Sequence, residues 1–111
     1  MISENEKLLI ASKYKKTSKY ILDMASNYPH KYLELKARII NTTFDVLELI
    51  YYGNIDESKR ILIIPKLKML DYYLLLSFNY KIISERQYKD SAKFLLEEVK
   101  MIHSWINEKK E

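Results

Sequence analysis

The chain contains no cysteine, a single glycine and two prolines among its 111 residues. Without cysteine there is no thiolate nucleophile, zinc–thiolate site or disulfide, so the composition gives no reason to place the chain in an oxidising compartment. One glycine is too few for a glycine-rich phosphate-binding loop. So few glycines and prolines also leave little material for tight turns, which argues against an all-β fold.

Long apolar runs and a leader pattern are missing as well. No run approaches the roughly 18 apolar residues that a membrane-spanning helix needs. The first residues, Met1–Glu4, lack the basic-then-apolar layout of a signal peptide. We therefore expect a cytoplasmic protein without a membrane role. A length of 111 residues suits one domain and is too short for two, so we expect a single domain over residues 1–111.

Helical patterns fill most of the chain, and the clearest lies between Ile83 and Ile106. Its start, Ser84-Glu85-Arg86-Gln87, has the form of a capping box. Apolar or small residues then recur at alternating spacings of four and three, which places them along one side of a helix. These residues are Tyr88, Ala92, Leu95, Val99, Ile102 and Ile106. Trp105 lies beside this line.

The first helix is expected to begin at a second capping box, Ser3-Glu4-Asn5-Glu6, and to end before Pro29. Its apolar line has the same alternating spacing. The line consists of Ile10, Tyr14, Thr17, Ile21, Met24 and Tyr28.

The second helix is expected from about residue 31 to residue 52, with Gly53 in the left-handed position past its end. It carries two apolar lines on neighbouring faces. The first line is Leu33, Ala37, Ile40, Phe44, Leu47 and Tyr51, and the second is Tyr32, Leu35, Ile39, Val46 and Ile50. Two apolar faces exceed what a simple bundle needs from one helix. The helix is therefore either central or in contact with another subunit through its second face.

The third helix is expected to start at Asp56 as its N-cap. Its apolar line is Ile63, Leu67, Leu70, Leu74 and Phe78. Pro65 interrupts the pattern, and we expect one kinked helix, with a break before Pro65 as the alternative. Short connections between long helices favour antiparallel neighbours. The sequence therefore predicts an all-α, antiparallel up-down-up-down four-helix bundle.

Catalytic and metal-binding patterns are not found. His30 and His103 stand on different elements, and nothing supplies a nucleophile with an orienting partner. Carboxylate di-metal bundles use Glu-x-x-His, but Lys100 stands three residues before His103. Helical-bundle ribonucleases use Arg-x-x-x-x-His, but neither histidine follows an arginine at that spacing. We expect a protein that is not an enzyme, with no catalytic residue, metal or cofactor.

Two groups of basic residues contain no acids in the sequence. The first basic cluster is Lys13, Lys15, Lys16 and Lys19, and the second basic cluster is Lys59, Arg60, Lys66 and Lys68. Such surfaces could hold a phosphate backbone with salt-sensitive affinity. They could equally be the solvated faces of soluble helices. The formal net charge of +4 permits contact with nucleic acid without requiring it.

A subunit interface is the second candidate site, because tyrosine and tryptophan are enriched at interfaces and this chain has ten tyrosines. Tyr52, Tyr72, Tyr73 and Tyr80 do not all fit one apolar line. Together with Trp105 they suggest that the second face of the second helix meets another subunit. The candidate interface residues are Tyr32, Leu35, Ile39, Val46, Ile50 and Trp105.

The order of these elements resembles the Avd-like four-helix bundle family. The resemblance covers nearly the whole chain. It rests on Pro29, Glu48, Lys59-Arg60, the Ile83-Ser84-x-x-Gln87-Tyr88 turn and the final Ser104-Trp105-Ile106 segment. The family includes the accessory variability determinant of diversity-generating retroelements and proteins encoded in intervening sequences of bacterial 23S ribosomal RNA genes.

The resemblance implies a homopentamer that performs no chemistry. It also implies that the chain binds a reverse transcriptase and its template RNA or cDNA duplex, and so supports mutagenic cDNA synthesis. Lys13, Lys16, Lys19, Lys59 and Arg60 would then contact nucleic acid or polymerase. The alternative is a structural protein–protein interaction bundle of the intervening-sequence type with no nucleic-acid role.

Overall fold

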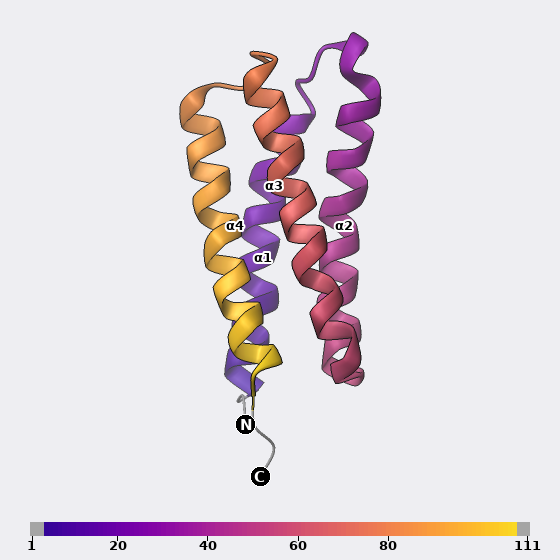
Figure 1. Cartoon of the computed structure of the whole chain (residues 1–111), viewed down its shortest axis with the longest axis vertical. Coiled ribbons are helices and arrows are strands. Elements are labelled where there is room, and N and C mark those ends of the chain that lie inside the picture. The colour runs from indigo at the N-terminus through magenta and orange to yellow at the C-terminus, as the bar shows by residue number, and fades with distance from the viewer. Residues whose placement is uncertain (1–3, 109–111) are drawn as a thin grey trace.

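Four long helices run alternately up and down along one axis in the computed structural model, which describes residues 4–108 (Figure 1). They are α1 (Glu4–Ala25), α2 (Leu33–Ile55), α3 (Ile63–Asn79) and α4 (Glu85–Ile106). Two short 3₁₀ helices, η1 (His30–Tyr32) and η2 (Glu57–Leu62), precede α2 and α3. The predicted all-α four-helix bundle is confirmed.

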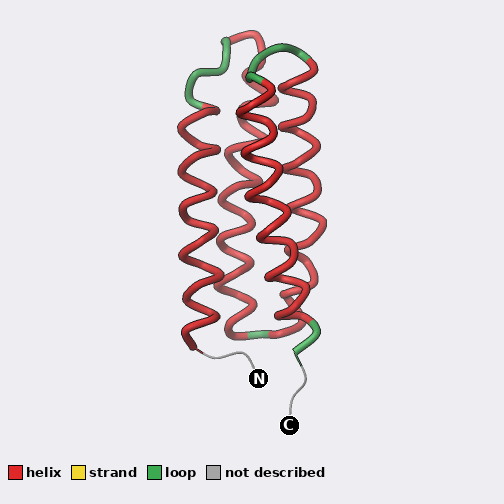
Figure 2. Tube along the Cα trace, turned by 90° about the vertical axis from the view of Figure 1, so that its left-hand side faces the viewer, coloured by secondary structure: helices red, strands yellow, loops and turns green. Residues whose placement is uncertain are grey.

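The helices form a ring, each packed against the next. Among residues 4–108, α1 packs on α2 and α4, and α3 packs on α2 and α4, so that α1 and α3 are diagonal. The α1–α2 and α3–α4 connections lie at one end of the bundle, and the α2–α3 connection lies at the other (Figure 2). The molecule is elongated, with extents of 51 × 22 × 18 Å.

The helix boundaries confirm one predicted cap and correct another. Ser84 Oγ accepts from the Gln87 N–H at 3.0 Å, and Gln87 Oε1 accepts from the Ser84 N–H at 2.8 Å, which completes the predicted capping box. Asp56 caps η2 rather than α3, because its carboxylate accepts from the Ser58 N–H at 3.0 Å. Ser3 of the other predicted box lies outside the described residues.

Pro65 does not kink a long helix, so the expectation of one kinked third helix is wrong. The chain is 3₁₀-helical up to Leu62, and α3 begins at Ile63, which puts Pro65 in its first turn. Backbone N–H groups in a first turn have no acceptor within the helix, so proline loses no hydrogen bond there. The alternative, a break before Pro65, is what the structure has.

The left-handed position belongs to Lys81, with φ of 63°, and not to Gly53. The Ile82 N–H donates to the Ser77 carbonyl at 2.8 Å and the Lys81 N–H to the Phe78 carbonyl at 2.9 Å, which is the Schellman pattern of a helix end. Gly53 instead lies inside α2 and is buried, and the helix continues to Ile55.

The predicted apolar lines of α1 and α3 face the core. All six residues of the α1 line are buried, as are Ile63, Leu67, Leu70 and Leu74 of α3, while Phe78 is half-buried. In α4 the buried face is turned slightly from the predicted one. It consists of Ser91, Leu95, Glu98, Ile102 and Trp105.

The apolar line of α2 that was predicted to meet another subunit is the one that faces the core. Its buried residues are Ile39, Thr42, Thr43, Val46, Ile50 and Gly53. Leu33, Phe44 and Tyr51 from the other apolar line are about half exposed, at 54%, 54% and 45%. Thr43 can face the core because its hydroxyl donates to the Ile39 carbonyl at 2.6 Å.

Leu95→Ala tests the α4 core face. Leu95 is 2% exposed, and truncation of a buried leucine should lower the free energy of unfolding by roughly 2–5 kcal/mol. The matched control is Leu96→Ala at the neighbouring position, where leucine is 55% exposed. Urea unfolding followed by circular dichroism measures both. A Leu95→Ala cost below about 0.5 kcal/mol would place Leu95 on the surface.

Candidate interaction surfaces

The first basic cluster lies on α1, and neighbouring side chains partly neutralise it. Lys15, Lys16 and Lys19 are exposed, whereas Lys13 is half-buried and ion-paired with Glu97 of α4. Lys19 pairs with Asp23 at 3.0 Å. Lys15 lies 5.6 Å from the centre of the Tyr51 ring on α2. The cluster contains no acidic residue in the sequence, but in the folded chain Glu97 and Asp23 lie next to its lysines.

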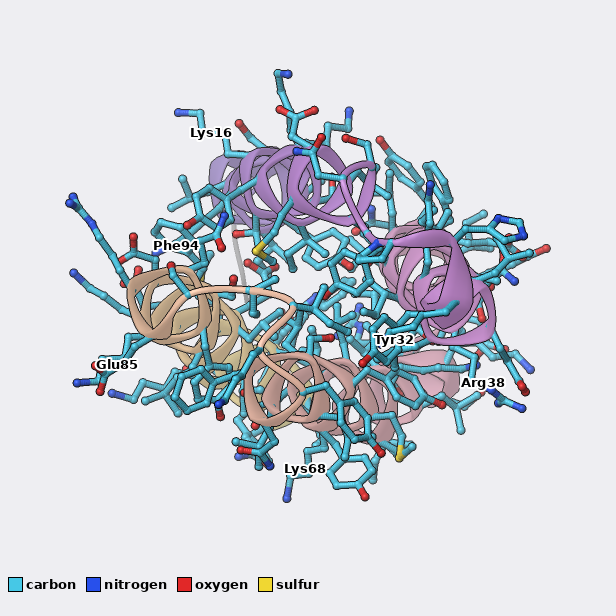
Figure 3. The ribbon with its side chains drawn as sticks, turned by 90° about the horizontal axis from the view of Figure 1, so that it is seen from above. Lys16, Tyr32, Arg38, Lys68, Glu85 and Phe94 are labelled. Atoms are coloured by element: carbon cyan, nitrogen blue, oxygen red, sulfur yellow. The ribbon has the colours of Figure 1, made fainter. Side chains whose placement is uncertain are left out.

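The residues of the second basic cluster differ in exposure and in their interaction partners. Lys59 and Lys68 are exposed. Lys66 pairs with Asp45 of α2, with Nζ and Oδ2 3.0 Å apart. Figure 3, seen down the bundle axis, shows Lys16 and Lys68 on opposite sides of the molecule. The two clusters therefore do not form one continuous basic surface.

Arg60 of the second cluster is a structural residue. Its Nε donates to the Gly53 carbonyl at 2.8 Å, and its guanidinium lies 4.3 Å from the centre of the Trp105 ring. An ion pair of 3.5 Å joins it to Glu108, and the Arg60 side chain is only 13% exposed. These contacts join η2 to the end of α4. The prediction that Arg60 contacts nucleic acid is corrected, because its donors are directed into the protein.

The candidate subunit interface is also corrected. Ile39, Val46 and Ile50 are 0% exposed and Trp105 is 1% exposed, so they belong to the core of one chain and cannot contact another. The other two residues, Tyr32 and Leu35, line an open groove between α2 and α3. The apolar face that α2 leaves exposed is the opposite one, with Leu33, Phe44 and Tyr51.

Glu98 is an unexpected feature of the core. It is 0% exposed, and neither carboxylate oxygen has a hydrogen-bond partner. Burial raises the pKa of Glu98 from 4.5 to about 8, with the nearby Lys13 charge lowering it and the Glu97 charge raising it. Burial, with the Glu98 charge second, also raises the pKa of the Tyr14 hydroxyl.

The apolar line predicted for α4 does not include Glu98, because that line consists of apolar or small residues only. The available signal was its spacing. Position 98 lies three residues after Leu95 and four before Ile102, in line with these two buried apolar residues of α4.

The histidines and carboxylates of the described residues are dispersed. Residues 4–108 contain no group of three or more His, Asp or Glu side chains arranged to hold a metal ion. His30 is in η1 at one end of the bundle, and His103 is in the last turn of α4 at the other. No helix within this range is long and apolar enough to cross a membrane.

Comparison with known proteins adds no identification. No protein-family model matches the chain, and no curated protein matches it significantly. The surfaces described above are therefore the basis for a functional proposal, together with the family resemblance of the sequence.

Proposed function

We propose that the chain is a non-enzymatic accessory protein of the Avd-like type. It binds a reverse transcriptase and template RNA as a cytoplasmic homo-oligomer, with a pentamer as the expected assembly, and so supports mutagenic cDNA synthesis. The observation that carries this proposal is the exposed set of Lys15, Lys16 and Lys19 on one side of α1, within the family-like order of helices. Exposed lysines along a helix provide positive charge for a phosphate backbone.

Two further observations support it. The Ile83–Tyr88 turn, the most specific part of the resemblance, has its Ser84–Gln87 capping box in place. The exposed Leu33, Phe44 and Tyr51 give α2 an apolar outer face of the kind that mediates association. In this proposal the outer face of α2, rather than its buried face, joins the subunits.

The test is the mass of the full chain by light scattering on a sizing column, with and without a structured RNA, at low and moderate salt. We expect a particle of about five subunits that shifts with RNA and loses the shift as salt rises. Copurification with a retroelement reverse transcriptase tests the second partner. A monomer that shifts with neither would contradict the proposal.

Charge reversal on α1 identifies the RNA surface. Lys16→Glu with Lys19→Glu should weaken RNA binding and reduce the slope of log affinity against log salt by about two, since each lost phosphate contact removes about one. The comparison pair is Lys59→Glu with Lys68→Glu, the exposed lysines of the second basic cluster, which should leave the slope nearly unchanged if α1 alone holds the RNA. Equal changes of the salt slope in the two double variants would contradict the assignment of RNA binding to α1.

A structural protein–protein interaction bundle with no nucleic-acid role is the second candidate. The ion pairs Lys13–Glu97, Lys19–Asp23 and Lys66–Asp45 favour it, because they neutralise three of the lysines that would otherwise contact phosphate. This reading predicts self-association without any RNA shift, even at low salt where phosphate contacts are strongest.

A further inference from the structure

Tyrosines and cations gather at the end of the bundle where the α1–α2 and α3–α4 connections meet. Tyr32 at the end of η1 and Tyr80 at the end of α3 stack on each other, with ring centres 5.8 Å apart and an angle of 21° between the planes. Tyr80 is 54% exposed. The pair therefore presents an aromatic surface to solvent although it comes from two different helix ends.

An open groove continues from this pair along α2 and α3. It has a volume of about 320 Å³, and Leu35, Tyr73 and Leu76 form its apolar wall beside the two stacked rings. Figure 3 shows Tyr32 and Arg38 on the α2–α3 side of the molecule, away from Lys16. The groove is thus separate from the first basic cluster.

Cations lie in the groove and next to its two stacked rings. Lys31 Nζ lies 5.1 Å from the centre of the Tyr32 ring. Arg38 lines the groove and is exposed, and Lys81 is exposed directly after Tyr80. Glu34 also lines the groove, but its carboxylate is ion-paired with Arg38 at 3.4 Å. Three cations and one carboxylate give this surface a net positive charge.

We propose that this surface, defined by Lys31, Tyr32, Arg38, Tyr80 and Lys81, binds single-stranded RNA. An unpaired base stacks on the Tyr32–Tyr80 pair, and the flanking phosphates contact Lys31 and Lys81. Single-strand sites combine aromatic side chains, on which bases stack, with cations that follow the backbone. Paired bases are not available for such stacking, so the surface selects unpaired RNA over duplex.

The charge of the surface decides between occupants. A purely apolar helix would leave Lys31 and Lys81 without a role, whereas a polyanion with flat bases uses both the rings and the cations. The inference extends the proposed RNA binding to single strands. It depends on residues outside the first basic cluster, so that either site can fail while the other stands.

The test is fluorescence anisotropy of a labelled, unstructured ribonucleotide of CAA repeats with the full chain at about 50 mM salt. Tyr80→Ala should weaken binding roughly tenfold or more, because base–aromatic stacking is lost. Tyr80→Phe retains the ring and should bind as the unchanged chain does. Tyr52→Ala is the matched control, because Tyr52 is 50% exposed near the other end of α2.

Three further readouts separate the possible outcomes. An abasic oligomer of the same length should bind as weakly to the unchanged chain as the CAA oligomer binds to Tyr80→Ala. Lys16→Glu with Lys19→Glu should leave the ratio of affinities for the CAA and abasic oligomers unchanged, because those lysines contact phosphate and not bases. Circular dichroism should show equal helicity in all variants.

The proposal is overturned if the unchanged chain fails to bind the CAA oligomer, or if Tyr80→Ala and the abasic oligomer leave affinity unaltered. A change of particle mass in Tyr80→Ala, with unaltered RNA affinity, would assign the surface to contact between copies of the chain instead. If the unchanged chain shows no shift with structured RNA but binds the CAA oligomer, the result would count against the α1 assignment and leave this inference standing.

Discussion

Glu98→Leu is expected to stabilise the bundle, and the gain should grow with pH. In the folded chain burial raises the pKa of Glu98 from 4.5 to about 8, so the buried carboxyl holds its proton more tightly than it does in the unfolded chain. Below about pH 4.5 the Glu98 carboxyl is protonated in both the folded and the unfolded chain, so its ionisation does not lower the free energy of unfolding. Between pH 4.5 and 8 the cost rises by at most about 1.4 kcal/mol per pH unit, and above pH 8 it stays constant.

The full pKa difference corresponds to at most about 5 kcal/mol, and a gain on the order of 3 kcal/mol at pH 8 is the expected result. Urea unfolding at several pH values measures it. Glu98→Gln should remove the pH dependence while retaining the cost of burying a polar group without a partner. Glu48→Gln is the surface control, because Glu48 is exposed on α2, and it should change stability little.

The quantity to compare between the two proteins is the slope of the free energy of unfolding against pH, because Glu98 is not the only group with a raised pKa. Burial also raises the pKa of Asp71, so its contribution to stability likewise falls as pH rises. The difference between the unchanged chain and Glu98→Leu isolates Glu98. Parallel stability curves for the two proteins would show that the carboxyl is solvated or paired.

Trp105→Ala is expected to lower the free energy of unfolding by about 3–5 kcal/mol, as truncation of a buried tryptophan does. Trp105 is 1% exposed, and it packs between Arg60 and the Gly53 backbone. The loss of its ring leaves a cavity where η2, the end of α2 and the end of α4 meet. Chemical unfolding followed by circular dichroism measures the cost.

Gly53→Ala tests the same contact, because its effect on the free energy of unfolding should change sign when Trp105 is removed. A methyl group at Gly53 would lie 2.8 Å from Trp105 Cη2 and 3.0 Å from Arg60 Cγ, so it should destabilise the chain by about 1–3 kcal/mol. In the Trp105→Ala background both close contacts with the indole ring are gone, and only the flexible Arg60 side chain has to shift. There Gly53→Ala should stabilise by up to about 1 kcal/mol, as in an ordinary helix. The same sign in both backgrounds would contradict the packing described here.

The sequence predicts helix faces best where apolar residues dominate the core line. In α1 and α3 they do, with Thr17 and Ser77 as the polar exceptions, and those faces are correctly predicted. In α2 the core line runs through Thr42, Thr43 and Gly53, so a count of apolar residues selects the other face. The threonines are suited to burial because a hydroxyl can bond within its own helix, as that of Thr43 does.

The candidate surfaces were less predictable, because they depend on contacts between distant parts of the chain. The role of Arg60 is set by Gly53, Trp105 and Glu108, of which the last two lie 45 and 48 residues away. The pairing of Lys13 with Glu97 spans 84 residues. A basic cluster in the sequence therefore predicts where lysines lie along a helix, but not which acids the neighbouring helices bring to them.

The order of packing around the ring has a consequence for how the bundle opens. Three of its helix–helix contacts join consecutive helices, but the contact between α1 and α4 joins the two ends of the chain. Closing so long a loop has the largest entropic cost, so we expect the α1–α4 contact to form last and to separate first. Glu98 of α4, with its influence on Tyr14 of α1, lies at this contact. We therefore expect alkaline pH to separate α1 from α4 while α2 and α3 remain packed against each other.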